Sequence, residues 1–206
     1  MTEIDYFPVL ENERVLLEPL QPTDLEALLP LALHPTLWEL ALTRITSRED
    51  LENYFREAFR EREAGLSIPF AVTDKKTGMK AGSTRFGNIT PAHRRLEIGW
   101  TWLGEDYQRT GLNRWMKLAM LDHAFGTLEV NRVELKTDLL NLKSQNAMLG
   151  IGATREGIFR SHMVSNGGRI RDSIFFSIIR QDWPAARAAL CDKLSKFKSD
   201  ETLAKG

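Results

Sequence analysis

The hydrophobic spacing changes abruptly near residue 104, and this change limits the folds that the chain can adopt. Residues 94–103 (RRLEIGWTWL) are rich in aromatic and β-branched residues, a composition typical of a strand. Residues 111–125 (GLNRWMKLAMLDHAF) have helical spacing and are apolar on more than one side. The pattern therefore predicts a strand followed by a buried helix, with a short turn between them.

The rest of the chain predicts a mixed α/β fold, a central sheet flanked by helices. Before the change we expect a strand, two helices and three strands, at 14–20, 24–34, 47–64, 68–74, 80–89 and 94–103. After the helix at 111–125 we expect a strand, a helix and two strands, at 132–137, 144–151, 154–159 and 170–179. Ser47 and Asp50 have the spacing of a capping box at one helix start. Asp182 is the expected cap of a last helix.

The domain organisation is predicted to be simple. The 206 residues suffice for one sizeable core, and no repeat or interdomain linker is visible. We therefore expect one domain at 10–183, followed at 184–206 by a helix with an apolar stripe of Leu190, Leu194 and Phe197. The tail after residue 199 is expected to be loose.

Composition argues against several classes of protein. Lys plus Arg equals Asp plus Glu at 28 each, so no basic field favours a nucleic-acid partner. The single cysteine, Cys191, allows no internal disulfide and no CxxC metal knuckle. The first ten residues lack a basic signal region, and no apolar run reaches about 18 residues. We expect a cytoplasmic protein without a metal site or a membrane span.

The turn Tyr107-Gln108-Arg109-Thr110-Gly111-Leu112-Asn113 joins the predicted strand to the predicted buried helix. The first turn of a helix points free backbone N–H groups outward, and the helix dipole adds positive charge there. Gly111 lets a phosphate approach the backbone without a Cβ in the way. The turn is neither a Walker motif nor a Rossmann fingerprint. By itself it fits a tight connection as well as an anion site.

Two motifs at this spacing resemble those of the GNAT acetyltransferase superfamily. Gln108-x-x-Gly111-x-Asn113 resembles its Q/R-x-x-G-x-G/A signature. Asn141-x-x-Ser144-x-x-Ala147, ending in Gly152-Ala153, resembles its second conserved segment. Residues 14–20 and 171–173 are similar to strands of RimJ/RimL-like members. The likeness covers residues 10–183, nearly the whole chain.

The resemblance implies a mostly antiparallel sheet that splays between the strands at 94–103 and 132–137. Acetyl-coenzyme A would lie in that splay as cosubstrate. The resemblance places its pyrophosphate on the amides of Gln108, Arg109, Thr110, Gly111, Leu112 and Asn113. The pantetheine arm would pair with the backbone at Trp102 and Leu103, with Asn141 on its other side. A backbone N–H near Leu103 would face the thioester oxygen.

The residues depart from the family pattern at two positions. Asn113 replaces the last Gly or Ala of the signature, and Met148 stands where many members carry a tyrosine proton donor. RimL-like members offer a serine instead, which Ser144 matches. Ser144 also suits a helix start for purely structural reasons.

Three side chains are candidate bases for the attacking amine: Glu97, Asp138 and His162. Glu97 lies in the strand that ends at the expected thioester site, and it also fits a strand residue paired with a nearby arginine. His162 has a reference pKa that suits base work but also fits a surface residue.

The predicted function is acetyl transfer from acetyl-coenzyme A to a primary amine, by direct attack in a ternary complex. The acceptor is a protein N-terminus or a small amine, and the mouth formed by residues 31–45 and 161–169 would distinguish them. The alternative is a non-catalytic acyl-coenzyme A-binding module with the same fold. Such domains commonly form homodimers, which the residues here neither require nor exclude.

Overall fold

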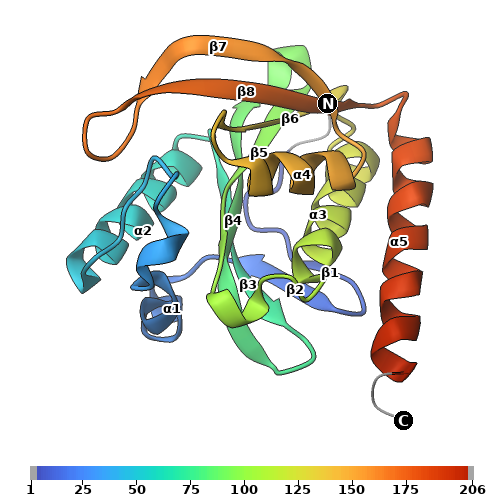
Figure 1. Ribbon diagram of the computed structural model, residues 1–206, viewed down its shortest axis with the longest axis horizontal. Helices are drawn as coiled ribbons and strands as arrows, with labels where there is room; N and C mark the ends of the chain where they lie inside the picture. The colour runs from blue at the N-terminus through green and yellow to red at the C-terminus, as the bar shows by residue number, and fades with distance from the viewer. Residues whose placement is uncertain (1–3, 204–206) are drawn as a thin grey trace.

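The computed structural model of the protein describes residues 4–203, which build one eight-stranded sheet with helices on both faces (Figure 1). The strand order across the sheet is β1-β2-β3-β4-β5-β6-β8-β7. The strands are β1 (Leu10–Glu11), β2 (Val15–Pro19), β3 (Ile68–Asp74), β4 (Met79–Thr90), β5 (Arg95–Leu103), β6 (Arg132–Asp138), β7 (Thr154–Val164) and β8 (Ile170–Ile179). All neighbouring pairs are antiparallel except β5 and β6.

Five α-helices flank the sheet in the described chain, and short 3-10 or π turns extend some of them. They are α1 (Leu25–Ala32), α2 (Arg48–Glu63), α3 (Leu112–Asp122), α4 (Leu142–Gly150) and α5 (Trp183–Leu203). The Ser47 side chain caps α2 by accepting from the Asp50 amide at 3.1 Å, as the sequence predicts. A π turn, His123–Thr127, follows α3.

The sheet separates two hydrophobic cores. Residues of α1 and α2 pack with Ala71 and Trp102 on one face. Residues of α3 and α5 pack on the opposite face, where Leu96, Ile98 and Leu103 of β5 point. Figure 1 shows the same division, with α1 and α2 on one side of the sheet and α3, α4 and α5 on the other. β5 therefore presents side chains to both cores.

The sheet opens between β5 and β6. Their parallel pairing covers only Arg95–Arg132, Leu96–Val133 and Glu97–Glu134. β5 continues to Leu103 paired with β4 alone, and β6 continues to Asp138 paired with β8 alone. Residues 98–103 therefore keep one edge free of a strand partner, which is the predicted splay.

Most predicted elements are confirmed, and the bounds of β3 and β8 match the prediction. The two-residue strand β1 was not predicted. β7 continues five residues beyond the predicted 154–159, and α4 begins two residues before the predicted 144–151. The last helix reaches Leu203, beyond the point where we expected a loose tail, and residues 204–206 lie outside the described residues. Leu190 and Leu194 are buried as predicted, whereas the side chain of Phe197 lies outside the described part of the chain.

Candidate active site

The predicted phosphate turn lies between the end of β5 and the start of α3. Gly111 is the N-cap of α3 with φ 84°, a left-handed conformation that glycine adopts without strain. No side chain caps this helix. The first turn of α3 therefore keeps backbone N–H groups that have no intrahelical acceptor, the arrangement that binds anions. Thr110 folds back within the turn, because its hydroxyl donates to the Tyr107 carbonyl at 2.8 Å.

Gln108 ties this turn to two other elements. Its Nε2 donates to the Leu103 carbonyl at 2.9 Å, which fixes the end of β5. Its Oε1 accepts from Nζ of Lys143 on α4. The turn, the free edge of β5 and the start of α4 are therefore held together as one surface.

Asn141 and Ser144 interact with each other at the start of α4. Asn141 is the N-cap, and its Oδ1 accepts from the Ser144 backbone amide at 2.9 Å. Asn141 thus has a structural role besides the pantetheine contact that the resemblance implies. Ser144 contributes its backbone to this cap, and its half-buried side chain lies one turn inside the helix.

A bulge in β5 shapes the splay. The pairing of β4 with β5 shifts between Ser83 and Arg85, and Trp100 adopts φ 49° opposite that shift. A non-glycine residue with positive φ at a bulge re-aims the strand's side chains. The Trp100 ring lies across Gly87, where an added Cβ would lie 2.2 Å from a ring carbon. Gly87 is therefore needed to accommodate the bulge.

Glu97 lies on the α1–α2 side of the sheet at the point where β5 and β6 part. Its side chain is buried, and Oε2 accepts from Lys136 Nζ at 2.5 Å and from Asn88 Nδ2 at 2.8 Å. The nearby arginines that could have paired with it, Arg94 and Arg95, bond elsewhere, to the Glu129 carbonyl and to Glu134. The Glu97 carboxylate also lies against Gly99, with Oε1 3.0 Å from the place that a Cβ on Gly99 would take.

Of the other two candidate bases, Asp138 is the last residue of β6 and His162 lies on β7. Asp138 is 1% exposed, pairs with Arg169 and accepts from the Leu140 amide at 2.9 Å. These bonds give it a structural role in the turn after β6. His162 is exposed on β7, where its ring contacts Phe159 and Phe175 with centroids 5.4 Å away in each case. No contact within the described chain joins either residue to Glu97.

The structure adds a polar pair that the sequence analysis did not single out. Lys117 of α3 is 6% exposed, and its Nζ donates to Thr101 Oγ1 at 2.7 Å. Burial lowers the Lys117 pKa to about 7. The available signal was one lysine within the apolar run WMKLAML. Such a residue is usually read as the edge of an amphipathic helix.

The two segments predicted to form the acceptor mouth extend from different elements. In the first, Trp38 packs on Trp102 with ring centroids 5.7 Å apart. The second is the tip of the β7–β8 hairpin, which projects past the end of β6 because β6 pairs with β8 only as far as Asp138–Ser173. Figure 1 shows this hairpin arching toward the side of α1 and α2.

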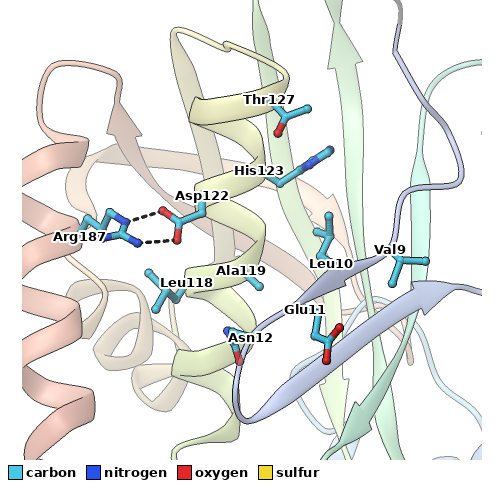
Figure 2. Close-up of a pocket in the computed structure, with 10 residues that line it drawn as sticks. All are labelled: Val9, Leu10, Glu11, Asn12, Leu118, Ala119, Asp122, His123, Thr127 and Arg187. Atoms are coloured by element: carbon cyan, nitrogen blue, oxygen red, sulfur yellow. Dashed lines mark hydrogen bonds and ion pairs between the residues drawn. The ribbon is translucent and has the colours of Figure 1, made fainter.

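A surface hollow of about 400 Å³ lies elsewhere, between β1, the second half of α3 and α5 (Figure 2). An Asp122–Arg187 ion pair forms one wall and His123 another. Burial lowers the His123 pKa, an effect that Asp5 opposes. Because the phosphate turn lies at the other end of α3, this hollow is separate from the candidate site.

Residues 4–203 show neither a metal-binding cluster nor a membrane-spanning helix. No group of three or more His, Cys, Asp or Glu side chains in this range is arranged to hold a metal ion. Within the same part of the chain, the helices are too short or too polar to cross a membrane.

Comparisons with known proteins agree with this geometry. A family model described as an acetyltransferase (GNAT) domain matches residues 14–154. A putative ribosomal N-acetyltransferase, YdaF of Bacillus subtilis (strain 168), is 26% identical over 183 residues, 84% of this chain and 94% of the relative. A putative acetyltransferase structure from T. thermophilus is 30% identical with TM-score 0.82, covering 91% of this chain and 98% of that one.

Another solved structure, Mycobacterium smegmatis RimJ in complex with CoA-disulfide, has TM-score 0.75 at 21% identity. The match covers 91% of this chain and 93% of the RimJ chain. The splayed sheet and the uncapped helix after it define an acetyltransferase fold. The chain belongs to the GNAT acetyltransferase family, which confirms the family predicted from the two motifs. Its similarity to a putative ribosomal N-acetyltransferase and to a structure named RimJ agrees with the RimJ/RimL-like resemblance.

Proposed function

We propose that the protein transfers an acetyl group from acetyl-coenzyme A to a primary amine in a ternary complex. The observation that carries the proposal is the uncapped start of α3 beside the free edge of β5. An anion site next to an unpaired strand edge fits a ligand with phosphates at one end and an amide-rich arm at the other. The CoA-bound structure of Mycobacterium smegmatis RimJ, which has this fold, adds support.

The residues present fit the cosubstrate. The amides of Gln108, Arg109, Thr110, Gly111, Leu112 and Asn113 would hold the pyrophosphate, and Asn113 leaves this role intact because the contacts come from the backbone. The arm would run back along β5 past Leu103 and Trp102, with Asn141 on its α4 side. The thioester supplies an activated acetyl carbon, and backbone N–H groups on the free β5 edge would stabilise its oxyanion.

The acceptor amine would approach from the α1–α2 face of the sheet, where Glu97 lies. Because Leu96 and Ile98 point to the α3 side, Glu97 points to the α1–α2 side. Its Oε2 is occupied by Lys136 and Asn88, so Oε1 would take the proton from the amine, directly or through water. Ser144 is a candidate proton donor to the coenzyme A sulfur. His162, in the segment expected to form the acceptor mouth, is a second candidate base.

The acceptor we propose is a protein N-terminus. Two of the similar proteins are named as putative ribosomal acetyltransferases, and the segments expected to form the mouth belong to the arching β7–β8 hairpin and to the end of α1 with the loop after it. We further expect the enzyme to act in the cytoplasm. A homodimer stays a prediction.

Release of the coenzyme A thiol tests the proposal. The protein is mixed with acetyl-coenzyme A and either peptides with free N-termini, the same peptides blocked at the N-terminus, or small primary amines. Turnover with free but not blocked peptides is the expected result. Turnover with small amines alone would contradict the peptide acceptor. Tight cosubstrate binding without turnover on any amine would favour the non-catalytic module.

A further inference from the structure

Lys117 occupies a costly position. Its side chain is 6% exposed in the centre of α3, and in residues 4–203 its ammonium forms no ion pair. A buried ammonium without a counter-charge strongly destabilises a fold unless it is well hydrogen-bonded. The protein partner it has is a neutral hydroxyl, that of Thr101 at 2.7 Å. This cost indicates a purpose other than packing.

One arrangement of the hydrogen bonds leaves the Thr101 hydroxyl proton available, because either hydroxyl of the Thr84–Thr101 pair can be the donor. The Lys117 ammonium can only donate, so Thr101 Oγ1 accepts from it. Thr84 is fully buried, and its hydroxyl lies 2.7 Å from Thr101 Oγ1. With Thr84 as the second donor, the Thr101 proton has only the Gly99 carbonyl at 3.3 Å as an acceptor within residues 4–203. That contact is long for an O–H donor, so a ligand atom can compete for the proton.

Thr101 lies where the reactive end of the cosubstrate is expected. It is exposed, and it belongs to the part of β5 beyond the last pair with β6. With the phosphates at the Gln108–Asn113 turn, an arm that follows the free β5 edge runs back toward Glu97 and reaches Thr101 before it. Thr101 and Lys117 lie on the α3 side of the sheet, and Glu97 lies on the other.

We propose that Thr101 is a further catalytic residue, whose hydroxyl donates a proton to the coenzyme A sulfur. Lys117 is the positioning residue, whose ammonium donates to the Thr101 oxygen and replaces that proton. The inference rests on the proposed acetyl transfer. It assigns the proton-donor role, left open by Met148 in place of a tyrosine, to β5 and α3 rather than to Ser144 on α4.

Atoms and electrons balance in this step. The amine nitrogen forms a C–N bond to the acetyl carbon and gives its proton to Glu97. The C–S bond breaks with its electron pair on sulfur. The sulfur takes the Thr101 hydroxyl proton while the Lys117 ammonium reprotonates the Thr101 oxygen, and Lys117 then takes a proton from solvent.

The test measures the thiol pKa of coenzyme A bound to the intact protein, from the ultraviolet absorbance of the thiolate against pH. Calorimetry on the same samples gives the affinity. In the wild type we expect a bound thiol pKa about one to two units below that of free coenzyme A, because the thiolate and the Lys117 ammonium, within about 4–6 Å of each other, stabilise each other's charge. Lys117→Met and Thr101→Val should remove that decrease, whereas Thr101→Ser should keep most of it. Lys75→Met, in the exposed β3–β4 turn, is the matched control and should behave as the wild type.

The outcomes separate the inference from the proposed function. Coenzyme A that binds with the same thiol pKa in the wild type, Lys117→Met and Thr101→Val would overturn the inference and leave the acetyltransferase proposal standing. A decrease abolished by Ser144→Ala alone would also overturn it. Failure of the folded wild type to bind coenzyme A would instead remove the proposed function on which the inference rests.

Discussion

The Glu97 carboxylate and the Lys136 ammonium lie 2.5 Å apart, at the point where β5 and β6 separate. Each strand supplies one partner, so the ion pair closes the apex of the splay. Asn88 of β4 holds the same carboxylate oxygen at 2.8 Å. One oxygen of Glu97 is therefore fixed, while the other lies against Gly99.

Glu97→Gln should lower kcat by about 10²–10⁴-fold, because the amide keeps the shape of the side chain but cannot accept the amine proton. The thiol-release assay with the accepted peptide measures this change. Acetyl-coenzyme A affinity should stay within about threefold, since Glu97 lies on the other face of the sheet. An unchanged kcat in the variant would reduce Glu97 to a structural partner of Lys136.

Lys117→Met should stabilise the protein at neutral pH. Burial lowers the folded-state pKa of Lys117 to about 7, below the unfolded value of about 10.4. Between these values the unfolded chain binds the additional proton, so wild-type stability falls as the pH falls from about 10 to about 7. Methionine has a similar length and no charge, so the variant does not lose stability in this way as the pH falls. We expect a gain of a few kcal/mol at pH 7 that shrinks toward pH 10.

Urea denaturation of both proteins at several pH values measures that difference. The Lys75→Met variant is the control for a lysine at the surface, and it should show no such pH dependence. A stability gap between wild type and Lys117→Met that stays constant from pH 7 to pH 10 would contradict the buried, uncompensated ammonium.

Gly87→Ala should disturb the bulge. A Cβ at Gly87 would meet the Trp100 ring at 2.2 Å, so the ring or the strand must move. Overpacking of this kind costs about 1–3 kcal/mol, and displacement of Trp100 would also shift Thr101. Gly126→Ala is the matched control, because nothing lies within 4 Å of the place that its Cβ would take. Equal unfolding free energies for the two variants would show that Trp100 does not depend on Gly87.

The local features of the fold could be predicted from the sequence. β3, β8 and the capped start of α2 follow from alternation, composition and the Ser47 side chain, all of which act over a few residues. β1 could not be predicted, because two residues carry no period of their own, even though their partners Leu16 and Leu17 lie only five to seven residues away.

The candidate site divides in the same way. The turn at Gly111 is readable because a left-handed residue before a helix favours glycine. The partners of Glu97 cannot be predicted from the sequence, since Lys136 lies 39 residues away and meets Glu97 only through the parallel pairing. The sequence predicts that α3 is buried, but Lys117 was missed because the enclosure of one particular polar side chain is a tertiary property. The structure brings Asp138 together with Arg169 and leaves His162 exposed, neither of which spacing along the chain could indicate.

Calorimetric titration with acetyl-coenzyme A tests the central claim most directly. The wild type is compared with Gly111→Trp, and Gly78→Trp is the control because Gly78 also has positive φ, at 71°, but lies in the distant β3–β4 turn. We predict affinity on the order of micromolar for the wild type and Gly78→Trp, and none for Gly111→Trp. A folded wild type that binds no acetyl-coenzyme A, or a Gly111→Trp variant that binds it as tightly, would contradict the account.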